Sequence, residues 1–139
     1  MEINELQAVA DLTCEALRIP PVAVAQITKR RGYARNGSRS VSIPKWATER
    51  SEAYAIYYVV HEVCHHIAGM GHGTDFQDCE VKALALWDIK IERKKIYARA
   101  LYSGNGEKLC GDRGTPPYDL LFADLAKKRQ ARLDKSLAT

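Results

Sequence analysis

The segment His61-Glu62-Val63-Cys64-His65 constrains the fold more than any other feature of the chain. Residues four positions apart lie on the same face of an α-helix, so His61 and His65 can offer imidazole nitrogens to one metal ion. Glu62 lies about 100° further around the helix, where its carboxylate can reach a water molecule on that metal without being a ligand. The segment therefore predicts a helix that carries a zinc site together with its general base.

A catalytic zinc ion takes three protein ligands and keeps a fourth position open. His72, which lies between two glycines shortly after the segment, is the nearest candidate for the third ligand. The four histidines of the chain all lie between positions 61 and 72, and this clustering favours a metal site over ordinary helix and loop histidines. His66 faces away from His61 by helical geometry, so we expect it to pack or to form a hydrogen bond instead.

The motif, the short loop after it and the element from Gly71 to Phe76 resemble the SprT-like (Spartan/Wss1-type) zinc metallopeptidases, over about residues 38–87, and the short loop is similar to that of the Wss1-like branch. The resemblance implies a zincin-like fold, peptide-bond hydrolysis and action on DNA-associated proteins. The chain has a shorter loop before the third histidine than Spartan-type proteases, and no Cys-x-x-Cys zinc ribbon follows it. The zinc ligands that the resemblance implies are His61, His65 and His72, and the implied catalytic base is Glu62.

Glu80 is the alternative third ligand, because many related metallopeptidases use a glutamate from a following helix. It shares a helix face with Phe76 and Trp87, which predicts that this face is buried. A buried carboxylate needs a partner, so Glu80 is also a candidate to accept the second N–H of a zinc-bound histidine. The third possibility is that Glu80 is a solvent-exposed glutamate without a role at the metal. The short spacing to Glu80 and the glycine-flanked context of His72 favour His72 as the third ligand.

Length and composition are those of one domain. A chain of 139 residues that is 46% hydrophobic can bury a modest core. Residues 1–11 carry acids and no base, so we expect no secretory or transit signal there. The longest apolar run, residues 53–60, is too short to cross a membrane. The four cysteines form no Cys-x-x-Cys pair, which favours a reduced, cytoplasmic setting with Cys64 and Cys110 as packing residues.

The net charge of +4 is concentrated in three basic stretches that suit a nucleic-acid backbone. For any single stretch, the solvated face of a hairpin or a helix is the commoner explanation. The stretches indicate a DNA-binding surface only if they converge in space. Their members are Lys29, Arg30, Arg31, Arg35 and Arg39; Arg93, Lys94, Lys95 and Arg99; and Lys127, Lys128, Arg129 and Arg132.

The hydrophobic pattern predicts an α+β, zincin-like fold, with a small three-stranded antiparallel sheet packed on the motif helix and with flanking helices. Asn36-Gly37 marks a hairpin, and the run from Thr74 to Gln77 fits a capping box that starts a new helix. The predicted elements are a helix over 2–17, a strand over 22–27, strands over 32–35 and 39–43, the motif helix over 51–68, a helix from 74 to about 89, a glycine-rich loop over 103–117 and a last helix from 115. Between about 89 and 102 we expect either a continuation of the helix from 74 or a further helix.

Together these features predict a zinc metalloendopeptidase in which Glu62 activates the attacking water. The alternatives are a nucleic-acid-associated zinc-binding module without turnover, and an adaptor that reuses the fold for binding. Glu62 argues against the module, because a structural zinc site needs no general base and is usually closed by four ligands, with cysteines prominent. Tyr97, Tyr102 and Tyr118 are candidates to stabilise the oxyanion, and the sequence does not choose among them.

Overall fold

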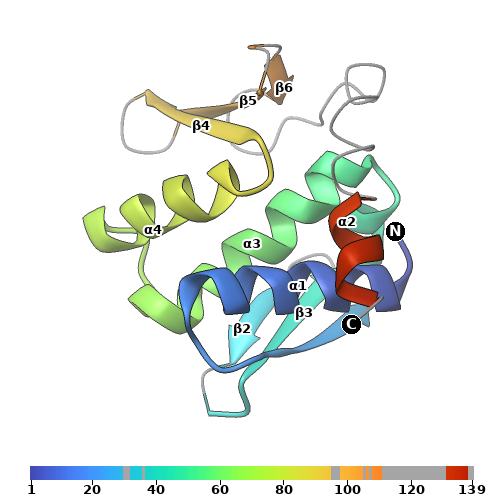
Figure 1. Cartoon of the computed structure of the whole chain (residues 1–139). Helices are drawn as coiled ribbons and strands as arrows, with labels where there is room; N and C mark the ends of the chain where they lie inside the picture. The colour runs from blue at the N-terminus through green and yellow to red at the C-terminus, as the bar shows by residue number, and fades with distance from the viewer. Residues whose placement is uncertain are drawn as a thin grey trace.

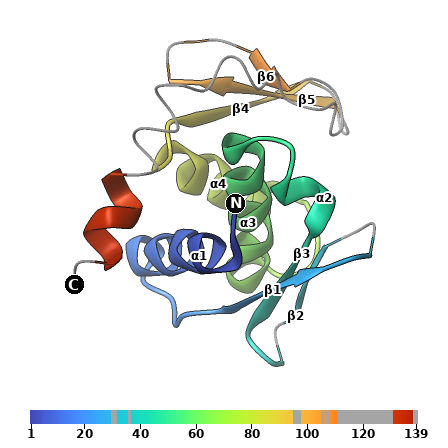
Figure 2. The same cartoon turned by 90° about the vertical axis from the view of Figure 1, so that its right-hand side faces the viewer.

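The computed structural model describes residues 1–29, 32–35, 37–94, 98–104, 106, 108–110 and 131–137. Over these residues the chain forms helices and two small sheets, which confirms the predicted α+β class (Figures 1 and 2). A helix over residues 131–137 follows the last strand. The other elements, in chain order, are α1 (Ile3–Leu17), β1 (Ala23–Ile27), β2 (Tyr33–Arg35), β3 (Ser40–Pro44), α2 (Lys45–Thr48), α3 (Glu52–Ala68), α4 (Thr74–Ala85), β4 (Ile89–Lys94), β5 (Ala98–Ser103) and β6 (Lys108–Cys110).

The motif helix α3 lies in the middle of the molecule, with the first sheet on one side and α4 on the other (Figures 1 and 2). It packs against α1, α2, α4 and strands β2 and β3. Ser51 caps its first turn, because the Ser51 hydroxyl accepts a hydrogen bond from the Tyr54 amide at 3.1 Å. Ile56 and Val63 are fully buried. The predicted buried helix over residues 51–68 is confirmed, and it holds the motif in a packed setting.

The first sheet has the strand order β1-β3-β2, with β1 parallel and β2 antiparallel to β3. The predicted all-antiparallel sheet is therefore wrong for the β1–β3 pairing. The physical reason lies in β3, where Val41, Ser42 and Ile43 are all buried. A strand that is covered on both faces takes the central position, so the chain passes from β1 to the opposite edge and returns along β3.

The hairpin predicted before β3 is confirmed by the antiparallel pairing of β2 with β3. Just before β2, the backbone at Gly32 passes close to both β3 and α3. A Cβ atom at Gly32 would lie 2.4 Å from the carbonyl oxygen of Ser42 and 2.7 Å from Cε1 of Tyr58. The Gly32 amide also donates a hydrogen bond to the Tyr58 hydroxyl at 3.0 Å. Only glycine allows this approach, which seats the sheet on α3.

Helix α4 begins at Thr74 as predicted but ends at Ala85, so its predicted continuation towards residue 102 is wrong. After it, the buried residues Ile89 and Ile91 alternate with exposed charged residues, which is the period of a strand. Strand β4 therefore starts at Ile89 and pairs antiparallel with β5, and β5 pairs with β6. Strand β6 lies within the predicted glycine-rich loop.

The capping box predicted at the start of α4 does not form. Gly73 is the N-cap residue, and no side chain caps the helix. Gln77 instead donates a hydrogen bond from Nε2 to the carbonyl oxygen of His72 at 2.9 Å. This bond ties the first turn of α4 to the loop that carries His72.

Trp87, just after α4, connects this part of the fold to α1 and to the last helix. Its indole donates a hydrogen bond to the Thr13 hydroxyl at 3.2 Å, and the Arg132 guanidinium lies 5.0 Å from the ring centroid. Leu133 is fully buried. The predicted opening helix is confirmed as α1. The start of the predicted last helix, from residue 115, lies outside the described residues. In the described part of the chain, no helix is both long and apolar enough to cross a bilayer.

Candidate metal centre

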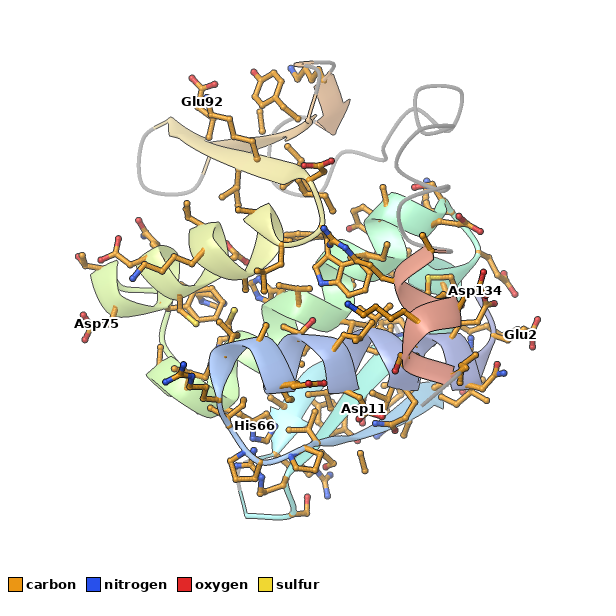
Figure 3. All side chains as sticks on the ribbon, viewed as in Figure 1. Glu2, Asp11, His66, Asp75, Glu92 and Asp134 are labelled. Atoms are coloured by element: carbon orange, nitrogen blue, oxygen red, sulfur yellow. The ribbon has the colours of Figure 1, made fainter. Side chains whose placement is uncertain are left out.

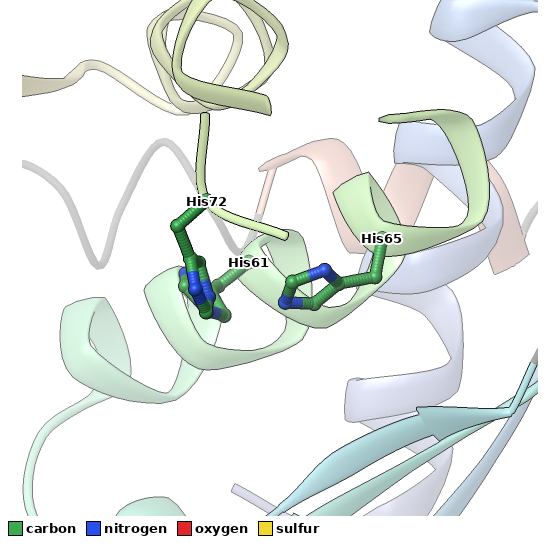
Figure 4. A group of neighbouring side chains, drawn as sticks. All are labelled: His61, His65 and His72. Carbon is green, nitrogen blue, oxygen red and sulfur yellow. The ribbon is translucent and has the colours of Figure 1, made fainter. Parts of the chain in front are cut away.

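Three histidines converge between α3 and α4 (Figure 4). His61 and His65 lie one turn apart on α3, and His72 lies in the loop between the two helices. One ligand atom from each lies within 4.8 Å of the other two, and the Nε2 atoms of His61 and His72 are 3.3 Å apart. Two nitrogens that bind one tetrahedral zinc ion at about 2.1 Å lie about 3.4 Å apart. The three predicted ligands are therefore close enough to bind one metal ion.

Hydrogen bonds at Nδ1 orient the two helical histidines. Nδ1 of His65 lies 2.8 Å from the carbonyl oxygen of Gly69, which can only accept, so Nδ1 carries the proton. Nδ1 of His61 lies 2.5 Å from Oε2 of Glu80 on α4. In a neutral ring this leaves Nε2 with its lone pair, and Nε2 is the atom that faces the convergence point.

Aromatic rings pack around the three imidazoles. Phe76, in the first turns of α4, stacks on His65 with ring centroids 4.4 Å apart, and it meets His61 and His72 edge-on. Tyr57, one turn before His61 on α3, lies with its ring centroid 5.8 Å from that of His61. Phe76 and Tyr57 are buried. The sequence analysis missed Tyr57, although its spacing of four from His61 places it on the same helix face.

Glu62 is buried, with 6% of its surface exposed. Burial and, secondly, the nearby negative charge of Glu80 raise the pKa of Glu62 to about 7. A carboxyl group with this pKa can accept and release a proton near neutral pH, as a general base must.

Glu80 is fully buried, so the interpretation as a surface glutamate is wrong. It contacts His61 through Nδ1, on the side of the ring opposite Nε2. A carboxylate in this position supports the histidine from behind rather than competing for the same metal. Glu80 can contact His61 only because of the way α4 packs on α3. From the sequence alone Glu80 could have been a metal ligand, a partner of a zinc-bound histidine or a surface residue.

His66 and Cys64 do not point to the metal centre. Nε2 of His66 donates a hydrogen bond to the carbonyl oxygen of Ser40 at 2.9 Å, which places its ring on the side of the first sheet, as expected (Figure 3). Its Nδ1 is buried and has no partner among the described residues. Cys64 is fully buried in the core, which confirms its packing role.

For several predicted functional residues, either the whole residue or its side chain lies outside the part of the chain that the structure describes. Of the oxyanion candidates, Tyr97 and Tyr118 lie outside it, and Tyr102 lies in β5. Of the basic side chains, Lys29 and Arg35 are described and exposed. Those outside the described side chains are Arg30, Arg31, Arg93, Lys94, Lys95, Arg99, Lys127, Lys128 and Arg129.

Imidazole ligands suit zinc, copper, iron and nickel, so the donor set alone does not select one metal.

A surface hollow between the start of α1 and the start of α3 lies at the opposite end of α3 and includes none of the predicted site residues.

Comparison of the chain with models of protein families, with curated proteins and with solved structures finds no match.

Proposed function

We propose that the protein is a zinc-dependent metalloendopeptidase of the SprT-like type, with a zincin-like fold. The observation that carries this proposal is the convergence of His61, His65 and His72, with Glu62 as the residue that follows His61 on α3. Three neutral imidazoles suit zinc, and a carboxylate next to such a site is the arrangement that metal-assisted hydrolysis uses. His72 is exposed, which leaves one side of the centre accessible to a substrate.

Zinc in such a site lowers the pKa of water and polarises a carbonyl group. The side chains of this protein would hold it and move the protons. His61 and His65 would bind it through Nε2, because Glu80 and the Gly69 carbonyl group occupy the Nδ1 atoms and orient the rings. Glu62 takes the proton of the attacking water and passes it to the nitrogen of the leaving amine.

The state of Glu62 favours an enzyme over a zinc-binding module or adaptor without turnover. A buried carboxylate with a raised pKa destabilises a fold at neutral pH, because its charged form loses its hydration. A module that only binds zinc would have no use for such a group. A hydrolase needs it, since a partly desolvated carboxylate is the stronger base.

The variant Glu62→Gln tests the proposal, because it keeps the shape of the side chain and removes the base. Zinc-loaded wild-type protein is expected to cleave casein, and Glu62→Gln to cleave it at least about 100-fold more slowly while binding the same amount of zinc. Asp78→Asn, which neutralises an exposed carboxylate on α4, is the matched control and should keep wild-type activity. Equal cleavage by wild type and Glu62→Gln would rule out the mechanism.

The resemblance leads us to propose further that the substrates are proteins associated with DNA. Arg39 donates hydrogen bonds to the carbonyl groups of Pro20 and Pro21, so it serves the fold. The exposed residues Lys29 and Arg35 are the described side chains to test. Reversing both charges should weaken DNA binding for all sequences alike, without changing zinc content, and binding should fall steeply with salt. If the wild-type protein binds no DNA at low salt, the proposal that its substrates are associated with DNA is wrong.

A further inference from the structure

The side chain of Phe76 lies against all three histidines of the metal centre. The ring centroids of the imidazoles in Figure 4 form a triangle, with sides of 5.1 Å between His61 and His65, 5.2 Å between His61 and His72, and 4.9 Å between His65 and His72. The phenyl centroid lies 5.0, 4.4 and 4.9 Å from the same three rings, in chain order. The four centroids therefore form a nearly regular tetrahedron, and the phenyl ring covers one face of the histidine triangle.

The spacing of the three imidazoles is that of a four-coordinate site. A metal ion bound to Nε2 at about 2.1 Å lies roughly 3.2 Å from the centroid of the ring. Three rings at tetrahedral angles around it have centroids about 5.2 Å apart, whereas the right angles of an octahedral site bring the centroids to about 4.5 Å. The observed sides of 4.9–5.2 Å fit the tetrahedral spacing. Phe76 packs between the three rings and keeps them this far apart.

The phenyl ring also determines which side of the triangle is open. On the side of Phe76, a fourth ligand at about 2 Å from a metal ion between the histidines would overlap the phenyl ring. Phe76 is 1% exposed and belongs to the core, so this side is also closed to water. His72 is exposed, so solvent reaches the three imidazoles from the opposite side.

We infer that Phe76 closes the back of the metal centre and leaves one open coordination position, on the side that solvent reaches. A catalytic zinc ion needs three protein ligands and a single position for water or a substrate carbonyl group. Phe76 is thus a positioning residue that acts through the three histidines, and it adds a geometric selection of the metal to the donor set. The inference rests on the metal-binding part of the proposed function and not on peptidase activity.

Cobalt(II) in place of zinc reports the coordination number, because its visible absorption is intense in a four-coordinate site and weak in a six-coordinate one. The full chain loaded with cobalt should give the four-coordinate spectrum. Phe76→Ala opens a position on the core side to water, so its spectrum should become that of a five- or six-coordinate ion. Its zinc affinity should fall by about 10–100-fold, as when other groups that orient metal ligands are removed. Phe76→Leu, which keeps a large apolar side chain, should restore most of both properties.

Leu84→Ala is the matched control, because Leu84 is fully buried on the same helix and its truncation also removes core volume. It should lower the melting temperature as Phe76→Ala does, while keeping four-coordinate cobalt and the wild-type zinc affinity. Circular dichroism establishes that each variant is folded. Phe76→Val removes the ring and keeps a branched apolar group, so it should shift the cobalt spectrum in the same direction if the alanine variant does not fold.

Three results would overturn the inference. The first is a five- or six-coordinate spectrum of the wild type, and the second is a four-coordinate spectrum of folded Phe76→Ala or Phe76→Val. The third is the same spectral change in Leu84→Ala, because lost core packing would then explain it.

The experiment also separates this inference from the proposed function. A wild-type protein that binds neither cobalt nor zinc would overturn the metal centre and the inference together. A wild-type protein that binds four-coordinate cobalt, loses this geometry in the Phe76 variants and cleaves no casein when loaded with zinc would contradict the peptidase alone.

Discussion

Oε2 of Glu80 lies 2.5 Å from Nδ1 of His61, so a fully buried carboxylate on α4 orients an imidazole on α3. The contact satisfies two groups at once. Glu80 gains the partner that a buried carboxylate requires, and His61 is held with Nε2 turned towards His65 and His72. The packing of α4 on α3 is therefore part of the proposed metal centre as well as of the core.

The purified protein should bind about one zinc ion per chain, because the three imidazoles converge on one point. His61→Ala and His65→Ala should each abolish tight binding, as measured by elemental analysis and by isothermal titration. His66→Ala is the matched control on the same helix, since His66 contacts Ser40 and not the centre. It should keep the full zinc content.

A wild-type protein that stays metal-free after refolding with excess zinc would contradict the metal centre itself. A zinc content that falls as far in His66→Ala as in His61→Ala would show that lost folding, rather than lost ligation, explains the result.

His72→Ala should weaken zinc binding more than Glu80→Ala does. We expect loss of Glu80 to reduce affinity about 10–100-fold, the usual effect of removing the partner of a ligating histidine. Glu80→Gln should lose less than Glu80→Ala, because the amide oxygen can still accept from Nδ1 of His61. Competition with a chelator of known affinity measures all three. A titration in which Glu80→Ala is the worst variant would make Glu80 a ligand.

The stability of the metal-free protein should fall as the pH rises through the range that Glu62 titrates. The pKa of Glu62 is raised from 4.5 to about 7 in the folded state, so folding favours the protonated carboxyl. The resulting stability is fully present below about pH 4.5 and is lost as the pH passes 7, a change of about 3 kcal/mol. Urea unfolding of Glu62→Gln with a chelator present should lack this contribution.

Glu62→Gln should therefore be more stable than wild type at pH 8, and the difference should disappear near pH 4. Asp78→Asn is again the control, because Asp78 is exposed. An equal stability of wild type and Glu62→Gln across this range would contradict the raised pKa of Glu62.

Gly32→Ala should destabilise the fold by about 1–3 kcal/mol, because a methyl group at this position meets the Ser42 carbonyl oxygen and the Tyr58 ring. Gly37→Ala is the matched control, since no atom lies within 4 Å of a Cβ built there. Urea unfolding of both variants measures the difference. Similar stability for the two variants would mean that the first sheet shifts on α3 without cost.

Local sequence patterns were sufficient for the helices that carry the histidines. The apolar period and the Ser51 cap predicted α3, and the glycines around His72 predicted the turn that returns the chain to the motif. These features act within one or two turns, so they can be read from neighbouring residues. The approach of His61, His65 and His72 to one another in space could therefore be predicted from these local features.

The pairing of strands and the roles of distant side chains required the tertiary structure. The central position of β3 in the first sheet follows from its burial on both faces, and the strand at Ile89 follows from burial of alternate residues. Both depend on what packs against these segments. The role of Glu80 likewise depends on the register of α4 against α3, which arises from contacts between residues far apart in the chain and is therefore absent from any local pattern.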